Sequence, residues 1–123
     1  MNVALWIAQI LLALAFAAAG IMKSTQPHEK LAANMGWVGD YSPGFVRFVG
    51  FAEILGALGL ILPAVTGIAP VLVPIAASGL AIEQVGAIAV HARRKEPQPI
   101  IANVVLIALA VFVAWGRFEA YPL

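Results

Sequence analysis

The sequence predicts an all-α integral membrane protein, a four-helix bundle in which residues 1–123 form a single transmembrane domain. Hydrophobic residues make up 63% of the chain and charged residues only 11%. A water-soluble fold of this composition would lack the polar surface needed to cover itself. The apolar residues also fall into four runs, each close to the length that crosses the ~30 Å hydrocarbon core. We therefore expect the lipid bilayer to surround this chain.

The first predicted helix covers residues 3–22, an apolar run interrupted only by Gln9. The alanines at 17–19 resemble a signal-peptide cleavage site, but no Lys or Arg precedes the run, which favours a retained helix. The next segment, residues 23–44, is polar and rich in Pro and Gly, which predicts one substantial loop.

The second and third predicted helices cover residues 45–62 and 70–91. Pro63 lacks the amide hydrogen that a continuing helix needs, so we expect the second helix to end before it. Pro70 and Pro74 fall early in the third helix, where a lost backbone hydrogen bond costs least. A short turn therefore joins these two helices.

The fourth predicted helix covers residues 100–115, after a turn with a basic cluster. Lys and Arg resist transfer across the membrane, so their distribution predicts the orientation. Most lie in or beside the segments that follow the first and third helices: Lys23, Lys30, Arg47, Arg93, Arg94 and Lys95. Only Arg117 lies at the opposite end. We expect a multi-pass protein of the cell inner (plasma) membrane with these two segments in the cytoplasm and both termini outside it.

Small residues recur in three of the predicted helices. Because lipid is as apolar as leucine, helices associate in it through close packing and polar contacts. The small residues are Ala13, Ala17 and Gly20 in the first helix, Gly50, Gly56 and Gly59 in the second, and Ala76, Gly79, Gly86 and Ala87 in the third. We expect close helix contacts at these faces. Where such a face is exposed to lipid, it could also pack against a second copy of the chain and form a homo-oligomer.

Two glutamates, Glu53 and Glu83, fall inside the predicted spans. A charge there costs about 2.5–3.5 kcal/mol even on the lenient insertion scale, so each needs a partner, a cavity or a function. Each lies eight residues from the predicted cytoplasmic end of its helix, roughly 12 Å deep, so they share one level. If the protein is an enzyme, we expect Glu53 and Glu83 to be its catalytic acid and base. They would share a proton if their faces meet.

Other polar residues lie near the same predicted surface, on helix faces that can converge. Converging faces would enclose a narrow polar cavity, walled by Phe16, Phe48 and aliphatic residues. The residues expected to bind a ligand there are Lys23, Arg47, Gln84, His91, Asn103 and Phe16. Lys23 has the alternative of reaching the membrane interface, and His91 that of a helix-end residue. The alternative for Asn103, as for the polar residues at positions 9 and 117, is an interhelical hydrogen bond.

Several classes of site are disfavoured. The chain has no cysteine, so thiolate metal sites and disulfides are excluded. His28 lies far in sequence from any complementary ligand set, and we expect no metal site. No basic patch is large enough to follow a phosphate backbone, so we expect no nucleic acid partner.

Four segments carry a resemblance to a known family. They are AFAAAGIMKS at 15–24, GFAEILGALGLILP at 50–63, the stretch from SGLAIEQVGA to VHARRKE at 78–96, and WGR at 115–117. With these segments the chain resembles the DoxX-like family of small four-helix bacterial membrane proteins along nearly its whole length. The resemblance implies four transmembrane helices and places Lys23, Glu53 and His91 on recurrent polar positions. Glu83 and Gln84 depart from the family pattern, which usually has apolar residues there.

The sequence is compatible with three functions. The family takes its name from a subunit of an archaeal thiosulfate:quinone oxidoreductase, and redox and quinone-linked roles are proposed for some members. The resemblance thus implies a subunit or accessory protein that binds a lipid-soluble small molecule such as a quinone, with a soluble redox subunit as partner. The second function is an autonomous enzyme that uses Glu53 and Glu83 for isomerisation or epoxide opening of a hydrophobic substrate. The third is a structural or assembly factor.

Overall fold

The structure is a computed structural model that describes residues 1–123, apart from the side chain of residue 120. Its elements in chain order are α1 (Asn2–Thr25), α2 (His28–Asn34), the 3₁₀ helix η1 (Gly36–Asp40), α3 (Pro43–Thr66), α4 (Leu72–Arg93), α5 (Pro97–Trp115) and the π-helical turn η2 (Gly116–Ala120). Within the described residues, four helices are long and apolar enough to cross a membrane. The prediction of an all-α membrane bundle is confirmed.

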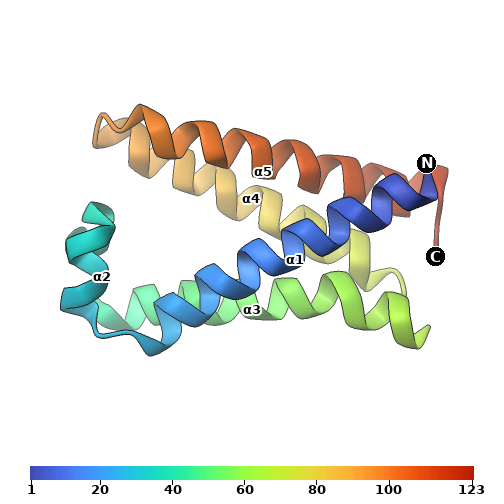
Figure 1. Cartoon of the computed structure of the whole chain (residues 1–123), viewed down its shortest axis with the longest axis horizontal. Helices are drawn as coiled ribbons and strands as arrows, with labels where there is room; N and C mark the ends of the chain where they lie inside the picture. The colour runs from blue at the N-terminus through green and yellow to red at the C-terminus, as the bar shows by residue number, and fades with distance from the viewer.

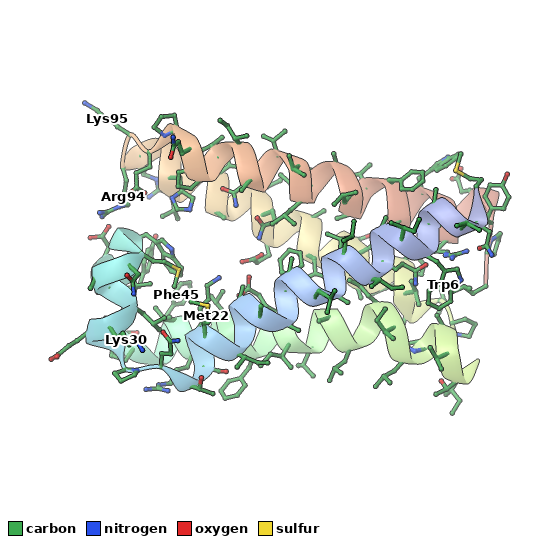
Figure 2. All side chains as sticks on the ribbon, viewed as in Figure 1. Trp6, Met22, Lys30, Phe45, Arg94 and Lys95 are labelled. Atoms are coloured by element: carbon green, nitrogen blue, oxygen red, sulfur yellow. The ribbon has the colours of Figure 1, made fainter. Side chains whose placement is uncertain are left out.

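The four long helices form two pairs (Figure 1). Helix α1 packs mainly against α3, and α4 packs mainly against α5. Both chain termini lie at one end of the bundle, whereas α2 and the turn between α4 and α5 lie at the other (Figure 1). An apolar core joins the pairs, and its largest buried members are Leu12, Phe16, Leu60, Val73, Leu80 and Val113. Many large apolar side chains point outward instead (Figure 2), as expected of a surface that faces lipid tails.

The polar segment 23–44, predicted to be a loop, is largely helical. Helix α1 continues to Thr25, and α2 and η1 follow it. Three buried residues, Leu31, Val38 and Val46, form a small second core that packs α2 and η1 against the start of α3. Because this short apolar pattern is interrupted by polar residues and glycines, it gives no clear helical period in the sequence. The segment covers one end of the bundle.

Two helix boundaries near prolines also differ from the prediction. Pro63 lies inside α3, which ends at Thr66. The helix ends where Gly67 adopts a left-handed conformation (φ 74°) and donates its backbone N–H to the Pro63 carbonyl. Helix α5 begins at Pro97, a residue type favoured in the first turn because its missing N–H would have no helical partner.

The two backbones of the α1–α3 pair touch. A Cβ atom placed on Gly20 would lie 2.5 Å from the carbonyl oxygen of Gly50, and a Cβ on Gly50 would lie 2.8 Å from the carbonyl oxygen of Gly20. The prediction of close contacts at Gly79 and Gly86 is wrong, because a Cβ there would meet no atom within 4 Å. The glycine contact that matters for the site is therefore the one between α1 and α3.

Candidate functional site

A buried ion pair joins α1 and α3 one turn from the glycine contact. Lys23 Nζ lies 2.8 Å from Glu53 Oε1, and the two side chains are 11% and 2% exposed. The ammonium also lies over the Trp37 ring, 5.6 Å from its centre. Close backbone approach lets the long Lys23 side chain reach Glu53 inside the bundle. The pair removes the isolated charge that a carboxylate in lipid would otherwise carry.

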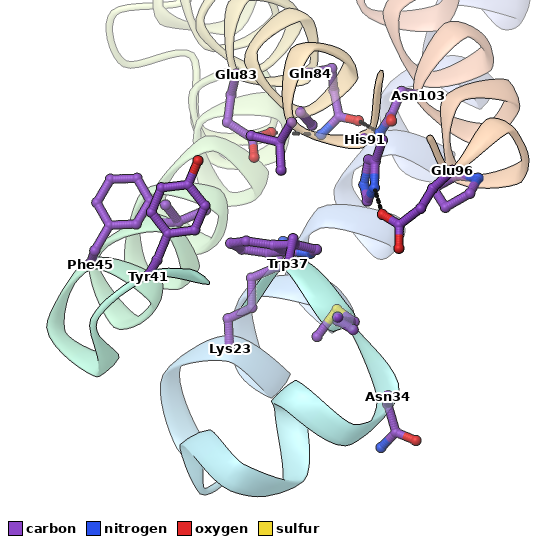
Figure 3. A pocket seen from close by; sticks show the side chains of 16 residues that line it. Lys23, Asn34, Trp37, Tyr41, Phe45, Glu83, Gln84, His91, Glu96 and Asn103 are labelled. Atoms are coloured by element: carbon purple, nitrogen blue, oxygen red, sulfur yellow. Dashed lines mark hydrogen bonds and ion pairs between the residues drawn. The ribbon is translucent and has the colours of Figure 1, made fainter. Parts of the chain in front are cut away.

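A second set of hydrogen bonds joins α4 and α5 (Figure 3). Gln84 Nε2 donates to Glu83 Oε2 at 2.6 Å, and Asn103 Nδ2 donates to Gln84 Oε1 at 2.6 Å. Asn103 is 8% exposed, and its buried Oδ1 has no partner. The carboxyl groups of Glu83 and Glu53 are near enough to interact, so the two helix pairs share one polar layer.

A partly open cavity of about 400 Å³ lies beside this layer. Its polar side is formed by Glu83, Gln84 and Asn103. Its other side is aromatic: Trp37 and Tyr41 meet edge-on with ring centres 5.9 Å apart, while Tyr41 and Phe45 stack at 5.0 Å. Figure 3 shows the aromatic side chains facing the polar group across the opening. The arrangement can accept a flat ring and hydrogen-bond its polar substituents.

Charged residues connect the two sides of the cavity at the end of the bundle. His91 Nδ1 lies 2.9 Å from Glu96 Oε1, and both residues line the cavity. Arg94 forms ion pairs with Glu96 and with Asp40 of η1. The hydrogen bond with His91 and the neighbouring Arg94 charge lower the pKa of Glu96 below its ordinary value. The carboxylate therefore stays ionised at neutral pH and holds the turn between α4 and α5 beside η1.

Comparison with known families identifies the chain. The sequence profile of the DoxX-like family matches residues 7–113, which include the whole polar layer and the cavity. The chain belongs to the DoxX-like family. No match was found among curated proteins or among solved structures. Family membership and the four apolar helices make this DoxX-like protein a multi-pass membrane protein.

Five of the predicted catalytic and ligand-binding residues line the cavity of the DoxX-like protein: Lys23, Glu83, Gln84, His91 and Asn103. The residue Glu53 does not line it, although it contacts Lys23, which does. A ligand in the cavity would therefore meet the carboxyl group of Glu83 and not that of Glu53.

Three other residues lie away from the cavity. Arg47 donates a hydrogen bond to the Ser24 carbonyl oxygen at 2.9 Å, which gives a partner to a backbone carbonyl in the last turn of α1. Phe16 is 1% exposed in the apolar core between the helix pairs, and Phe48 is 68% exposed on the outer face. Placing these aromatics in the cavity wall was wrong, because the aromatic wall comes from η1, Tyr41 and the first turn of α3 instead.

The aromatic wall was missed because residues 23–44 were interpreted as a loop. Trp37 lies on η1, Tyr41 is the extended residue after it and Phe45 lies in the first turn of α3, so no single helical period in the sequence places them on one side. The wall also includes Met35, which packs with the small core of α2 and η1. Folding of this short helical segment thus creates one side of the site.

A separate polar cluster lies at the opposite end of the bundle. Arg117 Nε donates to Gln9 Oε1 at 2.7 Å, and Gln9 Nε2 donates to the Leu60 carbonyl at 2.8 Å. Arg117 also donates to Asn2 Oδ1. The predicted interhelical hydrogen bonds of Gln9 and Arg117 are confirmed. They fasten the two chain ends together and lie apart from the cavity.

Proposed function

We propose that this DoxX-like protein binds a lipid-soluble small molecule with a polar ring, such as a quinone, and acts as a subunit or accessory protein of a membrane redox system. The observation that carries the proposal is the cavity, in which an aromatic wall of Trp37, Tyr41 and Phe45 faces the polar residues Glu83 and Asn103. A ring would stack on the wall while its oxygen substituents meet the polar side. The cavity volume, about 400 Å³, is in the range of small-molecule sites.

The basic residues at this end of the bundle support a cytoplasmic location for the cavity mouth. Arg93, Arg94 and Lys95 follow α4 directly, and Lys23 and Lys30 lie on the segment that covers the cavity. Electron transfer to a bound quinone would need a partner with a redox centre. We place that partner, a soluble redox subunit, on the cytoplasmic face beside α2.

The geometry favours binding over acid–base catalysis by two glutamates. Glu53 is 2% exposed, is paired with Lys23 and does not reach the cavity lining. A catalytic acid or base must lie within hydrogen-bond reach of the group whose proton it transfers. Of the two glutamates, only Glu83 lines the cavity, and this leaves the proposed enzyme without its second catalytic group.

Fluorescence of Trp37 tests the proposal, because quinones quench tryptophan on contact. The chain has three tryptophans, Trp6, Trp37 and Trp115, so changing the outer two to phenylalanine leaves a single reporter in the cavity wall. Titration of this protein in nanodiscs with decylubiquinone should give saturable quenching. Ala87 lines the cavity, and Ala87→Phe should fill it and weaken binding at least about tenfold, equivalent to 1.4 kcal/mol.

The matched control is Ala89→Phe, which adds the same ring two residues further along α4 at an exposed position. This variant should bind decylubiquinone as the parent protein does. Quenching that is not saturable, or that is equal in the parent and in Ala87→Phe, would show that the quinone only dissolves in the lipid and would refute the proposal.

A further inference from the structure

Two hydrogen bonds link Glu83 to Gln84 and Gln84 to Asn103, and the protonation state of Glu83 determines which group donates in each. An ionised carboxylate only accepts hydrogen bonds, so the bond of Glu83 must be donated by the Gln84 NH₂ group. The Gln84 carbonyl oxygen then faces Asn103 and must accept from its NH₂ group. The remaining oxygen, Asn103 Oδ1, is left without a partner.

Protonation of Glu83 allows the opposite direction with the same heavy-atom positions. A carboxylic acid donates one O–H, which the Gln84 carbonyl oxygen can accept after a flip of the amide. The flipped Gln84 NH₂ group then donates to the oxygen of Asn103, which flips as well. Both hydrogens of the Asn103 NH₂ group become free. In each end state the nitrogen and the oxygen of the Gln84 amide keep one hydrogen-bond partner each, and the two states differ in what Asn103 offers beside the cavity.

Here we infer, building on the proposed function, that the protonation state of Glu83 selects the ligand. With Glu83 ionised, Asn103 offers an acceptor and the cavity binds a ring hydroxyl, as in a phenol or a hydroquinone. With Glu83 protonated, Asn103 offers donors and the cavity binds a ring carbonyl, as in a quinone. Binding of the carbonyl form is thereby linked to the uptake of one proton at Glu83.

The unpartnered Asn103 Oδ1 is the second observation that points to a ligand. A buried acceptor without a hydrogen bond destabilises a folded protein, and native structures rarely leave one. Asn103 is more than nine-tenths buried and lines the cavity, so a ligand hydroxyl seated there would satisfy its oxygen. Asn103 Oδ1 is thus able to accept a hydrogen bond from a donor in the cavity.

Other titratable groups face Glu83 and have to be separated from it in a test. Glu53 of α3 interacts with it, and Lys23 of α1 pairs with Glu53. His91 of α4, Glu96, which precedes α5, and Tyr41, which precedes α3, line the same cavity. Helix α5 contributes the amide of Asn103. Replacing Glu83 with glutamine leaves all of these in place, so it isolates the contribution of Glu83 to any pH dependence.

The ligand arm of the test titrates 4-octylphenol, its methyl ether and decylubiquinone with the Trp37 reporter over the full pH range in which the protein stays folded. Above the Glu83 midpoint the phenol should bind at least tenfold more tightly than the ether, and Asn103→Leu should abolish this preference. As the pH is lowered toward the midpoint, the affinity for decylubiquinone should rise tenfold per pH unit, and below the midpoint it should level off. Glu83→Gln should remove this dependence on pH.

The second arm needs no ligand. In ¹⁵N spectra of the protein in detergent, the side-chain NH₂ signals of Gln84 and Asn103 should shift with one common midpoint, equal to that of the Glu83 carboxyl ¹³C signal. Glu83→Gln should leave both NH₂ signals unchanged with pH. The NH₂ signal of Gln9, at the far end of the bundle, is the internal control and should not follow this midpoint.

The outcomes separate this inference from the proposed function. Cavity-dependent binding with equal affinity for phenol and ether, or with the same pH dependence in Glu83→Gln, refutes the selection and leaves the binding site standing. If binding does not depend on the cavity, the proposed function is refuted. The spectra alone then show whether protonation of Glu83 reverses the hydrogen bonds of the Gln84 and Asn103 amides. Amide signals that ignore the Glu83 midpoint overturn the inference in either case.

Discussion

Replacement of Lys23 by methionine is expected to lower the free energy of unfolding by about 3–5 kcal/mol. Lys23 is the cation within 2.8 Å of Glu53, whose side chain is 2% exposed. Removing it leaves a buried carboxyl group without its ion-pair partner and beside a second carboxyl group, that of Glu83. Reversible unfolding in mixed micelles of dodecylmaltoside and SDS measures the loss.

The control for this prediction is the double variant Lys23→Met, Glu53→Met. Replacing both members of a buried pair with apolar residues of similar size is often neutral or stabilising, so most of the stability should return. The interaction free energy from the cycle of single and double variants should therefore be large. Additive losses in the double variant would mean that the two side chains do not interact in the folded protein.

Replacement of Gly20 by alanine is expected to cost about 2–3 kcal/mol, at the upper end of what overpacking usually costs. The added methyl group would lie 2.5 Å from the Gly50 carbonyl oxygen and 2.7 Å from the Ile54 side chain. The carbonyl belongs to backbone and cannot turn away, so α1 and α3 must move apart. This movement also lengthens the reach from Lys23 to Glu53, and ligand binding in the cavity should weaken together with stability.

The matched control is Gly79→Ala on α4, where the added methyl group would meet no atom within 4 Å. The same substitution should cause no loss there, because it fills open space and favours the helical backbone. Equal losses at Gly20 and Gly79 would contradict close contact between α1 and α3.

The sequence predicted the helices better than the site, for physical reasons. The four spans follow from long apolar runs, since every backbone polar group in lipid must be satisfied within the segment. Glu53 and Glu83 were recognised because a charge inside a span requires an explanation. The rotation of α3 and α4 about their axes decides which of the two glutamates a ligand reaches. Apolar residues surround both helices, so the sequence does not indicate which face of each helix points inward.

The cavity wall could not be predicted from hydropathy, because it belongs to a short folded segment of low overall hydropathy. Trp37 and Tyr41 belong to a polar segment whose fold rests on three buried apolar residues, Leu31, Val38 and Val46. Phe16 was assigned to the cavity wall, and it lies two helical turns before Lys23 in one stripe along α1. The α4–α5 pair, however, covers that part of α1 and buries it. A stripe identifies a shared face, but the neighbouring helix decides whether the face lines a cavity or a core.

The polar layer that joins the four helices can be measured directly by solid-state NMR of the protein in lipid bilayers. We predict strong dipolar coupling between ¹⁵Nζ of Lys23 and the carboxyl ¹³C of Glu53, matching the 2.8 Å separation of Nζ and Oε1, and between ¹⁵Nδ2 of Asn103 and the amide ¹³C of Gln84. The variants Lys23→Met and Asn103→Leu identify the signals. If Lys23 couples only to water and lipid headgroups, and Asn103 shows no transfer to Gln84, the polar layer does not exist in the membrane and the proposed site is wrong.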